Sequence, residues 1–566
     1  MPKNIATGTS DFCKIRERNN FLVDKTLFIK DWFNKADEVT LITRPRRFGK
    51  TLNMSMLECF LSSEYKNRSD LFEGLKISED PEIMKLQGTF PVISLSFSSV
   101  KNDKVFEMKN NIASIIKLLY MRNNEIVHGS DKISEDYKKE YDRIKNGFIK
   151  DKQEEFDENL VAKSVLYLSE VLSIEYGKKV IILLDEYDTP LQEAWIQGFW
   201  NEILSFMRLF FTATFKDNKF MDRAVMTGIT RVSKESLFSG MNNLLICSLT
   251  TEHYQDYFGF TEQEVFDAMD EYGYKNKDEI KFWYDGFNVG SLTDIYNPMS
   301  VTFFLNSGII DSYWANSSSN DLVSKLIREG AKDIKSDFEI LLNGGSVTKK
   351  LDEQLVFNKL STSQSAIWSL LVMSGYLKSN LIRDKLYEIR IVNHETMLLL
   401  RNLIEGWFDE TVVGYYSDFI KSFLNCDTDS MNEYMNRIVF SSISTFDSAY
   451  NEDDFLAPEK FYHGLVLGML VELREHYAVK SNRESGFGRY DIMLVPHDKK
   501  DRAFIIEFKV VNKNKKETLE TALTNALAQI EEKKYEQELL DLGATDDNII
   551  KYGFAFEGKK VLIGQG

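Results

Sequence analysis

The chain has 566 residues, a formal net charge of −17, 43% hydrophobic residues and 28% charged residues. This length predicts two to four domains, and the composition is typical of a folded globular protein. The acidic balance argues against a surface that coats nucleic acid non-specifically, although a local basic groove stays compatible with it. The basic run Lys509–Lys516 alone is more typical of a solvated loop.

The amino-terminal residues lack the charged stretch and apolar run of a secretory signal, and no apolar stretch reaches the ~20 residues that span a bilayer. Four cysteines lack paired spacing and six histidines form no metal-ligand cluster. We therefore expect a cytoplasmic protein with reduced thiols, no membrane partner and no zinc site.

The first predicted domain, residues 1–250, alternates short apolar runs with long amphipathic segments. The expected strands are Val39–Ile42, Pro91–Phe97, Val180–Leu184 and Ala224–Thr227. These runs are continuously apolar, as in parallel strands that are covered on both faces. The pattern predicts an α/β fold, a P-loop NTPase-like parallel sheet with helices on both faces.

A Gly-Lys-Thr sequence follows the first strand and opens an amphipathic helix. In a P-loop, backbone N–H groups cradle phosphates, the lysine reaches the β- and γ-phosphates, and the threonine hydroxyl ligates Mg²⁺. The predicted nucleotide-binding residues here are Arg47, Phe48, Gly49, Lys50 and Thr51. The full motif has a glycine where Arg44 stands, so the match is incomplete.

The third strand ends in Asp185 and Glu186, at the sheet edge where open α/β folds bind ligands. Asp185 is predicted to hold Mg²⁺ through water, and Glu186 to polarise the attacking water. This strand end makes an ATP site the favoured interpretation of the Gly-Lys-Thr sequence. After the fourth strand, Thr227, Thr230 and Arg231 are either sensors of the γ-phosphate or an ordinary polar strand end. Likewise, Arg44, Arg46 and Arg47 either clamp phosphates or contact another domain.

The second predicted region, residues 251–407, is a mainly helical lid or connector, with Ile367–Leu377 and Glu395–Trp407 as core helices. The third, residues 408–566, opens with helices and continues as a small α/β unit. Its expected elements are the strands Tyr490–Val495, Ala503–Val510 and Tyr552–Phe556 and the helix Thr518–Leu540.

Asp491 on the first of these strands and Glu507 and Lys509 on the second form a candidate metal site. Residues i and i+2 of a strand share a face, and a hairpin would bring Asp491 beside Glu507. Two close carboxylates suit Mg²⁺, and Lys509 would orient or activate the nucleophile. The alternative is an exposed Glu–Lys pair. Candidate additional residues of this site are Gln529, Glu472 and Glu484, and the choice between the two glutamates stays open.

Several motifs resemble known families. The first set comprises Val23–Thr26, Arg44–Thr51, Leu183–Asp188, Thr227–Arg231, Asn243, Trp283–Gly286 and Tyr296–Pro298. It resembles the bacterial AAA-ATPase-like family. The second set comprises Asn482–Asp491, Ile505–Lys509 and Ala526–Ile530. It resembles the PD-(D/E)XK nuclease superfamily, whose fold is that of a small α/β restriction endonuclease.

The resemblance implies ATP binding by Lys50 and Thr51, hydrolysis aided by Asp185 and Glu186, and a nuclease core of Asp491, Glu507 and Lys509. It implies ATP and Mg²⁺ as cofactors, with Mn²⁺ as an alternative at the nuclease site. We expect nucleic acid as partner, DNA rather than RNA, and a homo-oligomer, since a neighbouring subunit's arginine often completes such ATPase sites.

The favoured function is a nucleotide-controlled nuclease in defence or mobile-element biology. One alternative is a switch protein whose nuclease-like fold holds nucleic acid or a partner without cleavage. Another is an ATPase acting on protein partners, with a degenerate C-terminal domain, which the intact nuclease core argues against.

Overall fold

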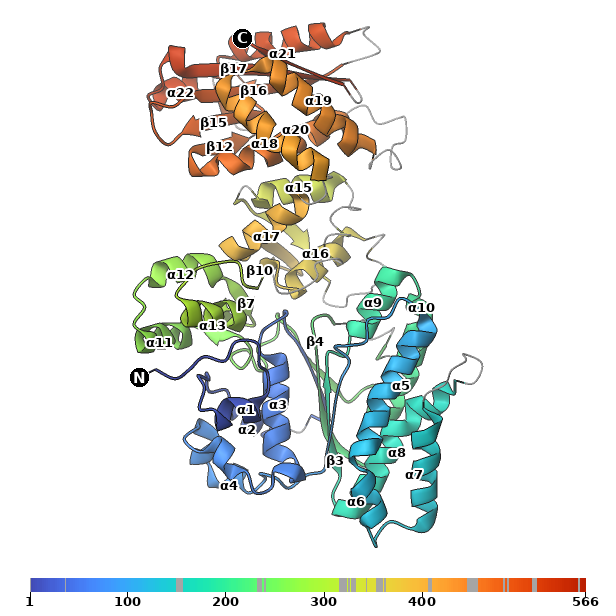
Figure 1. The fold of residues 1–566 in the computed structure, drawn as a ribbon. Helices are drawn as coiled ribbons and strands as arrows, with labels where there is room; N and C mark the ends of the chain where they lie inside the picture. Colours follow the sequence, from blue (N-terminus) through green and yellow to red (C-terminus); the bar gives the residue numbers. More distant parts are fainter. Residues whose placement is uncertain are drawn as a thin grey trace. The chain divides into compact units, whose positions relative to one another are not determined.

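The computed structural model shows a mixed α/β chain (Figure 1). It describes residues 2–566 except 36, 149–155, 232–236, 239–240, 315–322, 324–325, 327–331, 343, 353–359, 361–362, 406–409, 445–456, 482–483, 486–487, 512–516 and 558–559. Contacts divide the chain into two compact units, residues 1–330 with 344–399 and residues 331–343 with 400–566. Most of the region predicted as a separate connector, residues 251–407, therefore belongs to the first compact unit.

A five-stranded parallel sheet forms the centre of the first unit, in the order β2-β3-β4-β1-β5. The strands are β1 (Val39–Thr43), β2 (Val92–Ser96), β3 (Val180–Asp185), β4 (Met221–Gly228) and β5 (Leu244–Cys247). The first four confirm the predicted strands. The sequence interpretation missed β5, which has four residues and is only partly buried. Strand β4 lies between β1 and β3, so the Gly-Lys-Thr turn and the acidic strand end are not on neighbouring strands.

Helices cover both faces of this sheet, as expected for buried parallel strands (Figure 1). Helix α3 (Lys50–Leu61) lies on one face together with α1 (Phe12–Glu17), α2 (Leu27–Asn34) and α4 (Pro81–Met84). Its buried residues Leu57 and Phe60 belong to a hydrophobic cluster that includes Ile181 of β3. The other face carries α5 (Val105–Arg122), α8 (Glu158–Tyr176) and α10 (Trp200–Phe211). Further helices on the chain between β2 and β4 are α6 (Asn124–Gly129), α7 (Glu135–Gly147) and α9 (Thr189–Gln197).

The rest of the first unit contains helices and two small sheets. One sheet has the order β6-β8-β7, with β6 (Phe260–Thr261), β7 (Phe287–Val289) and β8 (Leu292–Tyr296). The other has the order β10-β11-β9, with β9 (Val347–Lys350), β10 (Leu377–Arg383) and β11 (Leu386–Ile391). The helices are α11 (Glu262–Tyr272), α12 (Lys277–Tyr284), α13 (Pro298–Ser307), α16 (Gln364–Met373) and the first residues of α17 (His394–Glu405), since this unit ends at Leu399. Helices α16 and α17 confirm that the two expected core helices exist, but α16 ends at Met373 and Leu377 begins β10. The expected end of the second helix, Trp407, lies outside the described residues. Strands β6 to β9 escaped prediction because they have two to five residues, and β10 and β11 because polar residues interrupt their apolar positions.

The second unit contains a mixed five-stranded sheet in the order β12-β15-β16-β17-β18. Its strands are β12 (Tyr477–Ser481), β15 (Ile492–Pro496), β16 (Ala503–Val510), β17 (Ile549–Glu557) and β18 (Lys560–Gln565). The helices are α15 (Lys332–Leu342), α18 (Glu410–Asn425), α19 (Thr428–Ser444), α20 (Ala457–Leu470), α21 (Leu519–Lys533) and α22 (Gln537–Asp541). The single helix expected over 518–540 is divided, because Lys534 adopts a left-handed conformation with φ +51° and ends α21.

Alternate residues of β16 face two different cores, which is the period-2 pattern of a covered sheet. Phe504, Ile506 and Phe508 join the cluster that includes residues of α18, α19 and α20. Ile505 faces the opposite cluster, with Ile530 of α21. The second unit therefore has a helical layer on each face of its sheet.

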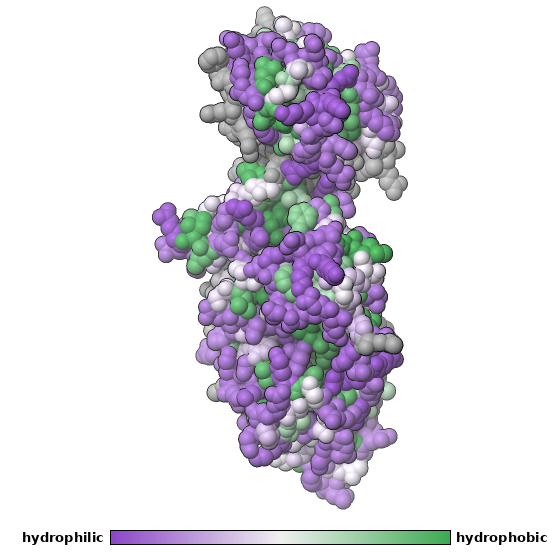
Figure 2. All heavy atoms as spheres, turned by 90° about the vertical axis from the view of Figure 1, so that its left-hand side faces the viewer, coloured by the Kyte–Doolittle hydropathy of each residue, from purple (hydrophilic) through white to green (hydrophobic). Residues whose placement is uncertain are grey.

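The visible surface is mainly hydrophilic, with hydrophobic side chains in small scattered groups (Figure 2). Among the described residues, none of the helices combines the length and the apolar character that crossing a membrane requires.

Candidate functional sites

The Gly-Lys-Thr turn joins β1 to α3. Gly49 is the N-cap residue of α3 and has φ +79°, a left-handed conformation that favours glycine. Arg47 also has a positive φ, +65°. The described helix starts at Lys50, so its first backbone N–H groups face the end of the sheet where β1 stops. This arrangement is that of a helix N-terminus that can receive an anion.

Lys50 is buried at this turn. Its Nζ donates hydrogen bonds to the carbonyl oxygens of Arg44 at 3.0 Å and Pro45 at 2.8 Å. Burial lowers the pKa of Lys50 to about 8, opposed by the charges of Glu186, Asp185 and other nearby acids. A phosphate at the helix start would offer this ammonium a stronger, charged partner than a neutral carbonyl.

Asp185 connects the turn to the sheet. One carboxylate oxygen accepts a hydrogen bond from Thr51 Oγ1 at 2.7 Å, and the other accepts one from the hydroxyl of Thr227 on β4. The structure therefore brings together the two residues predicted to hold Mg²⁺, Thr51 and Asp185. A hydroxyl and one carboxylate fit Mg²⁺, a cation that keeps several of its waters.

Glu186 follows at the strand end, with a strained positive φ of +53°. Its amide contacts Thr227 Oγ1 at 3.4 Å, and its carboxylate accepts a hydrogen bond from Thr189 Oγ1 at 3.2 Å. Strain at a non-glycine residue of a strand end is typical of a functional position. The geometry suits the predicted role of Glu186 as the residue that polarises water.

Asp188 is a buried residue that the sequence interpretation did not assign to the site. Its Oδ2 accepts hydrogen bonds from the amide of Ile229 at 3.1 Å, from the amide and hydroxyl of Thr230 at 2.8 and 2.7 Å, and from Gln192 at 2.8 Å. Of the two hydroxyls predicted to sense the γ-phosphate, that of Thr230 therefore binds Asp188 and that of Thr227 binds Asp185. The available signal was the third acid of the sequence Asp185–Asp188.

The side chain of Arg44 does not point toward the phosphate-binding turn, the segment 44–49 between β1 and α3. This corrects the hypothesis that Arg44 clamps phosphates. Its fully buried guanidinium donates to the carbonyl oxygens of Thr43 and Cys247, both at 2.9 Å, and of Tyr254 at 3.3 Å. Burial lowers its pKa to about 10, so the group stays charged at neutral pH. Arg44 is not among the residues with positive φ, so this position needs no glycine.

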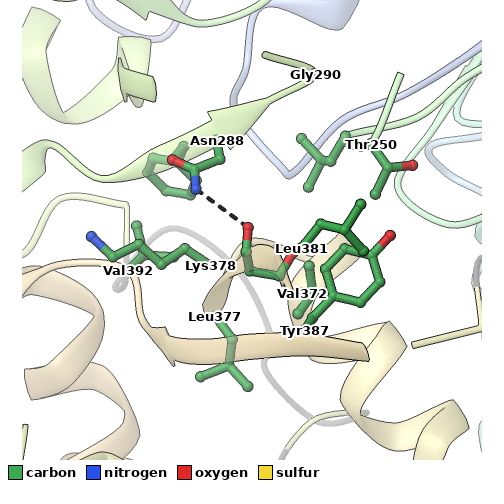
Figure 3. Close-up of a pocket in the computed structure, with 12 residues that line it drawn as sticks. Thr250, Asn288, Gly290, Val372, Leu377, Lys378, Leu381, Tyr387 and Val392 are labelled. Carbon is green, nitrogen blue, oxygen red and sulfur yellow. Dashed lines mark hydrogen bonds between the residues drawn. The ribbon is translucent and has the colours of Figure 1, made fainter. Parts of the chain in front are cut away.

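Phe48 is also buried, and its ring packs edge-on against Phe287 at 4.8 Å between centroids. Arg231 is half-buried directly after Thr230. Phe287 and Val392, which share a cluster with Phe48, also line the pocket in Figure 3. None of the predicted site residues lines this pocket, and its one charged lining residue is Lys378.

The C-terminal candidate site lies where β15 and β16 pair. The antiparallel register places Ile492 opposite Ile506, and its continuation by one residue places Asp491 opposite Glu507. Asp491 Oδ2 accepts a hydrogen bond from the amide of Phe508 at 2.8 Å. The two carboxylates predicted for a metal site are therefore neighbours at one position of the sheet.

Glu507 is buried and contacts two other residues of the predicted site, Lys509 and Gln529. Its Oε1 lies 3.2 Å from Lys509 Nζ and accepts a hydrogen bond from the side-chain amide of Gln529 on α21. Gln529 also donates to Tyr535 Oη at 3.1 Å, a contact that the sequence did not suggest. The side chain of Glu507 is 2% exposed and that of Lys509 is 29% exposed. The pair therefore does not lie on an open strand face, as the alternative interpretation required.

A histidine also contacts this site, and two glutamates predicted for it lie outside the described side chains. His463 Nε2 lies 3.2 Å from the backbone oxygen of Asp491, which the sequence interpretation missed because His463 is distant in the chain. The side chains of Glu472 and Glu484 lie outside the described part of the structure; Glu484 is in strand β13 (Glu484–Ser485), which pairs with β14 (Gly488–Arg489). Within the described residues, His, Cys, Asp and Glu side chains nowhere gather in a group of three that could hold a metal ion. Two carboxylates with water still fit Mg²⁺ or Mn²⁺.

Comparison with known proteins identifies two domains in the chain. Residues 6–238 match the AAA-ATPase-like family, described as a predicted AAA-ATPase, and residues 457–566 match the PD-(D/E)XK nuclease superfamily. The chain therefore carries an N-terminal AAA-ATPase-like domain and a C-terminal domain of the PD-(D/E)XK nuclease superfamily. An uncharacterized protein in the vnfD 5' region of Azotobacter chroococcum mcd 1 is 26% identical over 418 residues, which cover 71% of each chain.

Proposed function

We propose that the chain binds and hydrolyses ATP at the Lys50–Asp185 site, and that its C-terminal domain cleaves nucleic-acid phosphodiester bonds under control of this nucleotide. The observation that supports the proposal best is the presence, in each of two matched domains, of a buried carboxylate and a lysine at one site: Glu507 contacts Lys509 at 3.2 Å, and the charge of Asp185 acts on Lys50.

At the N-terminal site, the start of α3 and Lys50 bind the phosphates. Thr51 and Asp185 would hold Mg²⁺, which when bound would supply neutralisation of charge on the phosphate oxygens. Glu186 accepts a proton from the attacking water, and Thr189 orients its carboxylate through their hydrogen bond.

At the C-terminal site, Asp491 and Glu507 would hold a divalent cation, which when bound would supply a water of lowered pKa. Lys509 orients the water and stabilises charge on the scissile phosphate. Gln529 fixes the position of the Glu507 carboxylate through its hydrogen bond. We propose DNA as the first substrate to test, with Mg²⁺ or Mn²⁺ as the cation.

The test is a cleavage assay on single- and double-stranded DNA and RNA, with Mg²⁺ or Mn²⁺, in the presence and absence of ATP. Glu507→Gln keeps the side-chain size and should abolish cleavage, whereas Glu532→Gln removes an equal charge from the exposed face of α21 and should not. Lys50→Ala should abolish ATP hydrolysis and the effect of ATP on cleavage; Lys101→Ala, on an exposed loop, is its control. Cleavage that survives Glu507→Gln would contradict the assignment.

A second candidate is a nucleotide-dependent binding protein that holds nucleic acid or a protein without cutting it. The net charge of −17 favours the form of this function that holds a protein, because non-specific contact with nucleic acid normally needs a basic surface. Binding of a nucleic acid that changes with ATP, with no cleavage of any substrate and no effect of Glu507→Gln, would support this function instead.

A further inference from the structure

The motifs Trp283–Gly286 and Tyr296–Pro298 have no part in the chemistry proposed above. One of their residues, Asn297, contacts the phosphate-binding turn. The carbonyl oxygen of Arg46 accepts hydrogen bonds from Asn297 Nδ2 at 3.2 Å and from Trp314 Nε1 at 3.1 Å. Both donor side chains are buried. Two side chains from distant parts of the sequence thus hold one backbone carbonyl of the turn.

Both donors are themselves oriented by further hydrogen bonds. Asn297 Oδ1 caps α13 by accepting from the amide of Met299 at 2.9 Å, which turns the amide nitrogen of Asn297 toward Arg46. The backbone amide of Trp314 donates to Glu395 Oε1 at 2.6 Å, and Ser300 Oγ donates to Glu395 Oε2 at 2.8 Å. Glu395 and Ser300 are buried, so a connected polar network surrounds this carbonyl.

The Trp283–Gly286 motif supports the two branches of the network. Tyr284 Oη donates to the carbonyl of Asp311 at 2.8 Å and accepts from its amide at 3.0 Å, three residues before Trp314. Gly286 has φ +119°, and a Cβ there would lie 2.3 Å from the carbonyl oxygen of Val392, three residues before Glu395. The first contact fixes the segment that carries Trp314, and the second allows close approach of the segment that carries Glu395.

We propose that Asn297, Trp314, Ser300 and Glu395, together called the Arg46 clamp, position the phosphate-binding turn for nucleotide. In a trans peptide the C=O of one residue and the N–H of the next point in opposite directions. Holding the Arg46 carbonyl therefore aims the N–H of Arg47 away from the clamp. Phosphate-binding turns work through such N–H groups, and a carbonyl turned toward the phosphate would repel it.

The neighbouring carbonyls of the turn are also engaged, but differently. Lys50 Nζ binds those of Arg44 and Pro45, and this lysine must leave them to reach a phosphate. The clamp residues, by contrast, bind Arg46 without taking part in the chemistry. They are positioning residues, and the inference rests on the proposed nucleotide binding.

The test is the dissociation constant of a fluorescent N-methylanthraniloyl ATP analogue with Mg²⁺, measured on the full chain. Trp314→Phe removes the Nε1 donor and keeps an aromatic ring near Phe287 and Tyr376, whose ring centroids lie 6.3 and 5.5 Å from that of Trp314. Asn297→Ser removes the other donor and keeps a residue that caps helices. Each should weaken binding about fivefold, the value of one hydrogen bond, and together they should weaken it more than about tenfold.

Tyr313→Phe is the matched control. It removes a hydroxyl from the same segment, one that contacts Ser307 Oγ at 2.9 Å and the carbonyl of Ile309 at 2.8 Å and does not reach the turn. Its nucleotide affinity should equal that of the unaltered chain. Ser300→Ala, which removes one partner of Glu395, should weaken binding by less than either donor variant.

Thermal unfolding without nucleotide separates a positioning role from a purely structural one. If Trp314→Phe and Asn297→Ser lower the melting temperature and leave nucleotide affinity unchanged, the clamp only packs the domain and the inference is overturned. If one of them does not fold, the other and Ser300→Ala decide the same question. Absence of nucleotide binding in the unaltered chain would instead contradict the proposed function itself.

Discussion

The two lysine–carboxylate sites are assembled in different ways. At the C-terminal site, Glu507 and Lys509 stand two residues apart on β16 and meet at 3.2 Å. At the N-terminal site, Lys50 begins a helix after β1, whereas Asp185 ends β3, with β4 between these strands. One site is therefore formed by local strand geometry and one neighbouring strand, and the other by the order of strands in a sheet.

This difference affects how each site depends on the rest of its domain. The Glu507–Lys509 pair needs β16, the adjacent Asp491 and one helix that carries Gln529. The phosphate-binding turn is held by Arg44 on one side and by the Arg46 clamp on the other. We therefore expect substitutions remote in sequence to damage the N-terminal site more readily than the C-terminal one.

The largest effects should come from substituting the lysine of each site in turn and measuring the activities of both sites. Lys509→Ala should lower cleavage by at least about a hundredfold, because it removes a group that stabilises charge in the transition state. The same variant should leave ATP hydrolysis unchanged. Lys50→Ala should abolish ATP hydrolysis and the effect of ATP on cleavage, and should leave the cleavage measured without ATP unchanged. Parallel assays of phosphate release and nucleic-acid cleavage check this. Loss of both activities in either variant would show that the two sites are not independent.

Arg44→Gly restores the glycine of the full P-loop pattern and should nevertheless weaken the protein. It leaves buried carbonyl oxygens of β1, β5 and the following segment without their donor, which should cost more than about 2 kcal/mol of unfolding free energy. Denaturant unfolding measures the loss. Arg44→Lys keeps the charge but lacks the planar guanidinium group, so its unfolding free energy should lie between those of the unaltered chain and Arg44→Gly. Unchanged stability in Arg44→Gly would contradict the structural role assigned to Arg44.

Gly375→Ala tests how closely the middle of the chain packs on the turn. Gly375 has φ +86°, and a Cβ there would lie 2.8 Å from Pro45 Cβ and 3.1 Å from the ring of Phe287. Strain and overpacking should cost about 1–3 kcal/mol in thermal or denaturant unfolding. Gly177→Ala is the matched control, since Gly177 has φ +62° with open space around its Cβ position. Equal losses of unfolding free energy in the two variants would mean that backbone strain alone causes them and that the contacts with Pro45 and Phe287 add nothing.

A pH-dependent effect concerns Asp285, which is next to Gly286. Burial and the nearby Asp294 raise the pKa of Asp285 to about 7. Between the unfolded value, about 4, and 7, the folded state binds more protons, so the stability contributed by this group falls as pH rises. Asp285→Asn should therefore raise the melting temperature at pH 8 more than at pH 5.

Thermal unfolding at the two pH values provides the measurement. Asp278→Asn, at an exposed position of α12, controls for the loss of a charge; Asp285 is the residue that directly follows this helix. An equal change for Asp285→Asn at pH 5 and pH 8 would show that Asp285 does not titrate in this range.

The sequence by itself determined the elements with local signatures. Continuous apolar runs predicted the four strands β1 to β4, and β1 and β3 are buried at every position, as parallel strands covered on both faces should be. Strand β2, at the edge of the sheet, is buried only at alternate positions. The period of two in a strand was enough to place Glu507 and Lys509 together, and the register of a hairpin added Asp491.

Only the tertiary structure decided which distant residues meet. Strand order placed β4 beside β3, so that Thr227 rather than Thr230 binds Asp185. Long-range packing turned Arg44 inward toward β5 and brought Asn297 and Trp314 to the carbonyl of Arg46. No local pattern encodes such contacts, because buried polar groups must find hydrogen-bond partners wherever the folded chain supplies them.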